Sequence, residues 1–180
     1  MSLNPAQHPL PIAALGGLDR GGFVERLGSV VEHSPWVAQR AWSKAPFASF
    51  SALYDALSGC ILEAGPGEQI ALLRLHPELA GREAVAGTMT PDSSAEQGRL
   101  GLLALSAHDM ARLSGLNHAY QARFGFPFIV ALRLQASLES VFQAFDDRLA
   151  HDLGTELPIA LQQVCEVMRG RLARAVLEDA

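Results

Sequence analysis

The chain has 180 residues, of which 49% are hydrophobic and 18% are charged. This length is typical of one domain, and the composition supplies a core and disfavours disorder. Fourteen Lys and Arg residues against nineteen Asp and Glu residues give a formal net charge of −5. Binding to nucleic acids or to anionic membranes requires a positive surface, so we expect neither partner.

The first eighteen residues lack the basic region and the apolar run of a signal peptide. No uncharged apolar stretch is long enough for a membrane-spanning helix. We therefore expect a soluble, cytoplasmic protein. Cys60 and Cys165 each stand alone among apolar residues, and we expect buried thiols without a disulfide.

We interpret residues 1–18 as an N-terminal arm and residues 19–180 as one helical domain. Apolar residues recur at helical spacing along most of that domain. The helical segments expected from this spacing are 23–31, 50–61, 70–75, 96–105, 109–124, 137–149 and 156–177. The pattern predicts an all-α bundle of about seven or eight helices.

Two stretches interrupt the helical pattern. Residues 81–92 contain two glycines and a proline and are interpreted as a loop. Residues 126–132 form an apolar run that contains Pro127, which is typical of a short extended segment outside any sheet.

The sequence contains no motif that is typical of a metal or nucleotide site. The histidines show no metal-binding spacing, and no Gly-rich phosphate loop or Gly-x-Ser-x-Gly turn is present. The histidines are His8, His33, His76, His108, His118 and His151. A metal site therefore has no support in the sequence, and catalysis without a cofactor becomes the expectation if the protein is an enzyme.

Two histidine motifs lie at predicted helix ends. In His33-Ser34-Pro35-Trp36, Ser34 can cap a helix that Trp36 anchors in the core, and the wall of a cavity is the alternative. His76 ends a helix because Pro77 disfavours helical geometry in the residue before it. The negative end of the helix dipole favours an imidazolium there. His76 is therefore either a C-terminal cap or a rigidly presented acid.

Two polar clusters also have alternative interpretations. Ser93-x-x-Glu96 fits a capping box, although Ser93, Glu96 and Gln97 could instead line a pocket that His76 faces. Arg169, Arg171 and Arg174 fit a solvated helix face. An inward arginine would be a bidentate donor for a carboxylate or a planar amide.

Taken together, these stretches resemble the family of 2-oxo-4-hydroxy-4-carboxy-5-ureidoimidazoline (OHCU) decarboxylases, the last enzymes on the route from urate to (S)-allantoin. The similarity runs from about residue 19 to about residue 177 in the order of the family's motifs. The matching stretches are His33-Ser34-Pro35-Trp36-Val37-Ala38, His76-Pro77-Glu78-Leu79-Ala80-Gly81, Ser93-Ser94-Ala95-Glu96-Gln97-Gly98, Leu116-Asn117 with Tyr120, Arg123-Phe124-Gly125-Phe126-Pro127-Phe128-Ile129 and Arg169-Gly170-Arg171-Leu172.

The resemblance implies an all-helical fold, a homodimer, and neither a metal nor an organic cofactor. It implies that His76 and Glu96 are the catalytic pair. The substrate contacts that it implies are Pro77, Ser93, Gln97, Phe128, Ile129 and Arg171. Gly170 departs from the family's pattern, and a shift in register would put Arg169 in place of Arg171.

The chemistry of this family suits such side chains. The departing carboxylate leaves its electrons to an adjacent ring C=N bond, so no cofactor is required. Our hypothesis is that His76 acts as the acid and supplies or relays a proton, that Glu96 holds the hydroxyl or ureido group and keeps His76 charged, and that Arg171 orients the substrate. Two alternatives remain: a non-enzymatic helical interaction module, and a related enzyme that acts on another ureide or hydantoin.

Overall fold

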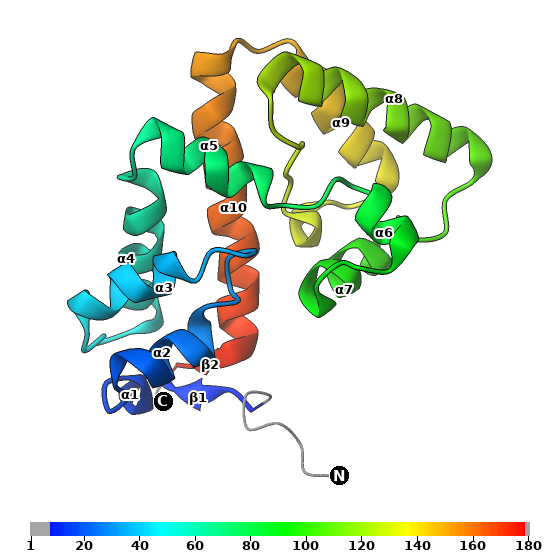
Figure 1. The fold of residues 1–180 in the computed structure, drawn as a ribbon. Coiled ribbons are helices and arrows are strands. Elements are labelled where there is room, and N and C mark those ends of the chain that lie inside the picture. The colour runs from blue at the N-terminus through cyan, green and yellow to red at the C-terminus, as the bar shows by residue number, and fades with distance from the viewer. Residues whose placement is uncertain (1–7, 179–180) are drawn as a thin grey trace. The chain divides into compact units, whose positions relative to one another are not determined.

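The computed structural model describes residues 8–178, and Figure 1 shows the elements in chain order. Ten α-helices and two short 3-10 helices make up nearly all of the regular structure in this range. One parallel pair of two-residue strands, β1 (Leu10–Pro11) and β2 (Val176–Leu177), is also present there. The predicted all-α fold is confirmed, with more helices than expected.

The chain forms two compact units, with boundaries between Gln69 and Ile70 and between Val167 and Met168. The first unit contains β1, β2, four helices and the first 3-10 helix. These helices are α1 (Ile12–Leu15), α2 (Arg20–Leu27), α3 (Trp36–Ala41), η2 (Trp42–Lys44) and α4 (Phe50–Leu62). Helix α3 packs against both α2 and α4. Asp19 and Ser49 cap α2 and α4 by accepting backbone N–H bonds, which explains where these helices begin.

The structure corrects part of the prediction for the N-terminal arm (residues 1–18). Residues 10–15 are folded into the first unit, because Ile12 and Leu15 are buried and β1 pairs with β2 near the opposite end of the chain. A contact between such distant segments leaves no local pattern in the sequence. Residues 1–7 lie outside the described part of the chain.

The second unit contains four complete helices, one 3-10 helix and most of the longest helix. These elements are α6 (Arg82–Ala86), α7 (Pro91–Arg99), α8 (Ala107–Phe124), η3 (Leu132–Leu134), α9 (Leu138–Leu149) and α10 (Leu153–Ala175). Helix α5 (Pro66–Arg74) crosses the first boundary, and α10 crosses the second. Helix α8 lies along α9 (Figure 1), and a cluster of aromatic rings fills the core of this unit.

Two boundaries in the second unit differ from the predictions. The expected loop 81–92 contains α6, which ends at Gly87 with a left-handed φ of 67°. The helix predicted over 96–105 is α7, which begins earlier because Thr90 caps it and Pro91 occupies its first turn. The prediction for 126–132 is confirmed in that this apolar segment forms no strand.

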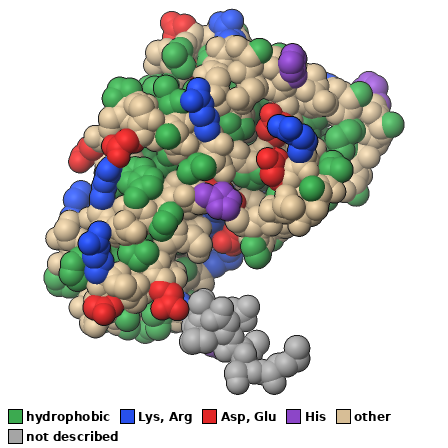
Figure 2. All heavy atoms as spheres, viewed as in Figure 1, with side chains coloured by type: hydrophobic (Ala, Val, Ile, Leu, Met, Phe, Trp, Pro, Cys, Tyr) green, Lys and Arg blue, Asp and Glu red, His purple; other side chains and the backbone are tan. Residues whose placement is uncertain are grey.

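Acidic and basic side chains are interspersed over the face that Figure 2 shows. Within the described range, none of the helices combines the length and the apolar character needed to cross a bilayer. Cys165 is buried as predicted, whereas Cys60 is only partly buried, and neither thiol takes part in a disulfide. Burial raises the pKa of the Cys60 thiol.

Candidate functional site

His76 follows the last turn of α5 and is nearly buried. Its backbone N–H donates to the Leu73 carbonyl at 3.2 Å, and its ring Nδ1 lies 3.1 Å from the Leu72 carbonyl oxygen. Because a carbonyl oxygen only accepts hydrogen bonds, Nδ1 carries the hydrogen in this contact. This contact engages Nδ1 and not Nε2.

The imidazole of His76 lines a cavity of about 320 Å³ that contains groups of both charges. The other residues around this cavity are Arg74, Glu78, Arg82, Glu83, Gln121 and Pro127. Arg74 is held in place there, because its Nε donates to the Gly125 carbonyl at 2.8 Å. Such a mixed lining suits a polar ligand that has both donors and acceptors.

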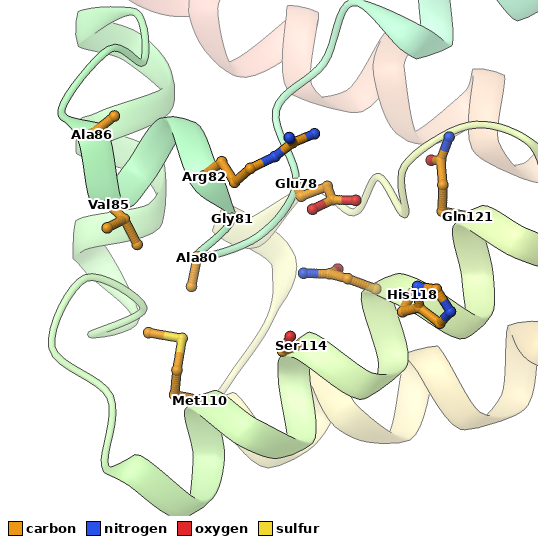
Figure 3. A pocket seen from close by; sticks show the side chains of 11 residues that line it. Glu78, Ala80, Gly81, Arg82, Val85, Ala86, Met110, Ser114, His118 and Gln121 are labelled. Atoms are coloured by element: carbon orange, nitrogen blue, oxygen red, sulfur yellow. The ribbon is translucent and has the colours of Figure 1, made fainter.

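A second cavity, of about 650 Å³, adjoins the first and shares Glu78, Arg82 and Gln121 with it. It lies between the segment after Pro77 and one face of α8. Figure 3 shows Glu78 pointing toward α8, and Ser114 and His118 facing it from that helix. The two cavities thus share one polar wall beside the His76 segment, and the second cavity also has apolar residues, among them Val85 and Met110, in its lining.

A tight turn over residues 78–81 separates His76 from α6. The Gly81 N–H donates to the Glu78 carbonyl at 3.2 Å, and Ala80 has a left-handed φ of 47°. A Cβ atom on Gly81 would lie 2.6 Å from the Glu78 Cβ, so this position requires glycine. Ala80 is strained, because a left-handed conformation is unfavourable for a residue with a Cβ.

Helix α7 carries three of the predicted site residues. The predicted capping box is wrong: Thr90, not Ser93, is the N-cap, and its hydroxyl accepts the Ser93 N–H. The Thr90-Pro91 pair was the signal for this start. Ser93 and Gln97 are buried on the same face of α7, one turn apart, whereas Glu96 is half-buried. The proposed pairing of Glu96 with His76 remains a prediction.

The Gln97 side chain joins α7 to the segment that follows His76 and Pro77. Its Oε1 accepts the Ala80 N–H at 2.8 Å, and its Nε2 donates to the Glu78 carbonyl at 3.3 Å. The structure therefore brings Gln97 against residues 78–80, which follow His76 and Pro77 in the chain.

The extended segment that contains Phe128 and Ile129 is also buried. The Phe128 ring stacks on Phe145 with centroids 3.7 Å apart. The Ile129 carbonyl accepts a bond of 2.7 Å from Nη1 of Arg148. A predicted substrate-contacting segment is thus fixed by a buried cation.

Sequence reasoning missed the charged cluster that contains Arg148. Glu156 accepts bonds from Arg148 at 2.5 and 2.8 Å, from the Tyr120 hydroxyl, and from His151 at 2.8 Å if Nδ1 is protonated. Burial is the main reason that the pKa of Tyr120 is raised far above its ordinary value. Arg148 lies three and seven residues after Phe145 and Val141, on their buried helix face. A charge in an apolar stripe was the signal that could have identified it.

Arg171, the predicted substrate-binding arginine, lies in the first unit. It is buried, and its Nη1 donates to Oε2 of Glu32 at 2.7 Å. The neighbouring Arg169 is exposed and lies over the Tyr54 ring at 5.2 Å. Arg171 is therefore the inward residue of the two, and Glu32 is a partner that sequence reasoning missed.

The His33 motif departs from the predicted cap. No side chain caps α3, and the Ser34 hydroxyl is buried without a hydrogen-bond partner. Trp36 is only half-buried, and the Arg40 guanidinium lies over its ring at 4.3 Å. Helix α3 is instead anchored by the buried residues Val37, Ala38 and Ala41.

Across residues 8–178, no three side chains of His, Cys, Asp or Glu gather into a group that could hold a metal ion. The expectation that the protein uses no metal remains a prediction.

A family model described as OHCU decarboxylase matches residues 17–173. The chain belongs to the OHCU decarboxylase family. A relative from Halalkalicoccus jeotgali, named 2-oxo-4-hydroxy-4-carboxy-5-ureidoimidazoline decarboxylase, is 37% identical over 163 residues, which are 91% of this chain and 90% of the relative. This membership confirms the resemblance that the sequence motifs indicated.

Two solved structures extend the likeness of this family member to the fold. A crystal structure of (S)-allantoin synthase has a TM-score of 0.76 and 25% identity, over 94% of this chain and 54% of that one. The present chain therefore spans about half of that protein's length. A crystal structure of OHCU decarboxylase in the presence of (S)-allantoin has a TM-score of 0.63 at 19% identity, over 81% of this chain and 93% of that one, and shows likeness of fold alone.

Proposed function

We propose that the protein decarboxylates OHCU to (S)-allantoin without a cofactor, with His76 as the acid and Glu96 as its partner carboxylate. Family membership over residues 17–173 supports the reaction class. The observation that carries the residue assignment is the fixed orientation of His76. Its Nδ1 is bonded to the Leu72 carbonyl, and the residue lines a cavity whose wall also includes Arg74, Glu78 and Glu83. Proton exchange is proposed to occur at Nε2.

In the proposed reaction, the bond between the carboxylate and the hydroxyl-bearing ring carbon breaks, and carbon dioxide leaves. The electron pair moves into the ring and onto the neighbouring C=N nitrogen, which gives an enol. The enol then loses its hydroxyl proton, while the nitrogen and the ureido-bearing carbon each gain one. The net uptake is one proton. The S isomer results when a single acid protonates the ureido-bearing carbon from one face of the ring.

His76 is proposed to polarise the C=N nitrogen and to supply or relay the proton that the ureido-bearing carbon gains. Glu96 would hold the hydroxyl or ureido group and favour the imidazolium by its charge. Pro77, Ser93 and the backbone of Phe128 and Ile129 are proposed substrate contacts, and the family resemblance alone adds Gln97 to them. Arg171 would orient the substrate without gripping the departing carboxylate, since tighter binding of the ground state than of the transition state slows a reaction.

The test is the stereochemistry of the product, because OHCU also decays spontaneously to racemic allantoin. Freshly generated OHCU is added to the protein, and carbon dioxide release and circular dichroism are followed together. Saturable formation of (S)-allantoin supports the proposal. Racemic product at the uncatalysed rate would overturn it and favour an interaction module, and activity on another ureide or hydantoin would favour the related enzyme.

We further propose a cytoplasmic homodimer, as the family resemblance implies. Sedimentation equilibrium should give twice the mass of the chain, and the mass of one chain would contradict this part of the proposal.

A further inference from the structure

The turn after His76 is held in a conformation that its own sequence disfavours. Ala80 has a left-handed φ of 47°, where a Cβ atom is unfavourable and glycine is usual. Strained residues persist only where their surroundings fix them, and they occur most often at functional sites. The question is what fixes this turn.

One of the contacts is the side-chain amide of Gln97 on α7. Its oxygen accepts the Ala80 N–H at 2.8 Å, and its nitrogen donates to the Glu78 carbonyl and to Sδ of Met89, each at 3.3 Å. Both amide hydrogens and one oxygen lone pair are thereby used. Gln97 thus has little hydrogen-bonding capacity left for a substrate.

The other contact is the side-chain amide of Asn117 on α8. Its Nδ2 donates to the Leu79 carbonyl at 2.9 Å, and the residue is only 6% exposed. Three consecutive residues of the turn, Glu78, Leu79 and Ala80, are therefore bonded by two amides from two different helices. All of these groups belong to the second compact unit.

The turn determines where the chain leaves His76. On its N-terminal side, the imidazole is fixed by the Leu72 carbonyl. Pro77 follows on its C-terminal side. Because the proline ring restricts φ, the position of the following turn limits the positions that the His76 backbone can take. A catalytic acid must be held close to its productive position, because a displacement of about 1 Å can cost about 100-fold in rate.

We propose that Gln97 and Asn117 are positioning residues, whose two amides hold the strained 78–81 turn and thereby fix the His76 imidazole. This inference rests on the proposed function for its kinetic consequences. It gives Asn117 a role that the motif comparison did not assign, and it moves Gln97 from substrate contact to support of the acid.

The test compares Asn117→Leu and Gln97→Glu with the wild-type protein. Asn117→Leu removes the donor to Leu79 at similar volume, and Gln97→Glu keeps an acceptor for the Ala80 N–H but loses both donors. We expect kcat to fall about 10- to 100-fold, since small misplacements cost this much, while KM changes by less than about threefold because the substrate contacts remain. A rise in KM with unchanged kcat would overturn the proposal, because it would indicate direct substrate binding.

Two further measurements separate positioning from general loss of stability. In the Asn117→Leu background, Ala80→Gly should restore part of kcat, because glycine adopts the left-handed turn without strain. Gln69→Ala is the matched control: Gln69 is also a side-chain amide that bonds two backbone carbonyls, those of Ile61 and Leu62, at 3.2 and 3.0 Å. It should lower the melting temperature without lowering kcat. An equal loss of kcat in this control would overturn the assignment.

Hydrogen exchange tests the same idea without any activity. The Ala80 amide should exchange at least tenfold faster in both variants than in the wild type, whereas unchanged protection would overturn the proposed hold on the turn. If Asn117→Leu does not fold, the kinetic measurement and the exchange of the Ala80 amide are both made on Gln97→Glu. If the wild type makes no (S)-allantoin, the proposed function fails, while the exchange result still decides whether the two amides hold the turn.

Discussion

Arg171 donates from Nη1 to Oε2 of Glu32 across 2.7 Å, and both side chains are almost completely buried. The two residues lie 139 positions apart in the chain. Removing two charges from water is costly, so each charge depends on its partner. The pair fixes the direction of the guanidinium, which a substrate-orienting role would require.

Glu32→Gln should therefore destabilise the protein strongly, because it removes the negative charge that lies 2.7 Å from a buried guanidinium. We expect a loss of about 3–5 kcal/mol in the free energy of unfolding, measured from urea denaturation midpoints. Glu68→Gln is the control, since Arg40 and Glu68 form an ion pair at the surface, where such pairs contribute little. Equal shifts in the two variants would contradict the importance of burial.

His76→Asn should abolish most of the catalysis and leave the fold intact. Asparagine can still donate a hydrogen bond toward the Leu72 carbonyl, but it cannot exchange a proton. A positioned acid contributes about 10²- to 10⁴-fold, so stereoselective formation of (S)-allantoin should slow by that order. Melting temperature and circular dichroism provide the control for folding. Turnover at the wild-type level would remove His76 from the mechanism.

Tyr120 should make the protein sensitive to alkaline pH. Burial raises the pKa of its phenol in the folded state, whereas the phenol of the unfolded chain ionises near its ordinary value. Below about pH 10 both states hold the proton; above it the unfolded state loses the proton first, and the free energy of unfolding falls by up to about 1.4 kcal/mol per pH unit. Stability is thus lost as pH rises.

Tyr120→Phe should remove the part of this alkaline slope that Tyr120 contributes and leave the part that the Cys60 thiol contributes, because burial raises the pKa of that thiol as well. At neutral pH the variant should be less stable by about 1.5–3 kcal/mol, because it loses a buried hydrogen bond to the Glu156 carboxylate. Urea midpoints between about pH 8 and 11 compare the two proteins. Parallel pH profiles would show that ionisation of Tyr120 does not limit stability.

The helices that the sequence predicted well have an apolar stripe and a clear cap. Helices α4, α8 and α9 begin directly after Ser49, Ser106 and Ser137, each of which accepts a backbone N–H bond. Helix α6 lacks such a stripe: Val85 is 79% exposed, so apolar periodicity could not reveal it. For α7 the sequence offered two possible starts, a capping box at Ser93 and the pair Thr90-Pro91. The helix begins at Pro91, because proline is favoured in the first turn.

The candidate site residues were predicted from motifs, whereas the hydrogen bonds that involve them were not predictable from the sequence. The family motifs singled out His76 and Gln97 as candidates. The structure adds that the Gln97 side chain bonds to Glu78 and Ala80, in the turn that follows His76. The partnership of Arg148 with Glu156 was not predictable from local periodicity, because each residue is simply a charge on an apolar helix face. Such pairs depend on which helices meet, and a single sequence does not give that information.

Two glycine-to-alanine substitutions should have opposite effects, and the difference tests the geometry of the turn. At Gly81 a new Cβ would lie 2.6 Å from the Glu78 Cβ, so the backbone must move. We expect Gly81→Ala to cost about 1–3 kcal/mol, as overpacking does, and to lower kcat by disturbing the segment after His76. Gly115→Ala, in the exposed interior of α8 where nothing lies within 4 Å, should instead stabilise the protein by about 0.5–1 kcal/mol, since alanine loses less backbone freedom on folding. Thermal unfolding of both variants provides the measurement, and a Gly81→Ala protein as stable and active as the wild type would show that the turn tolerates a Cβ.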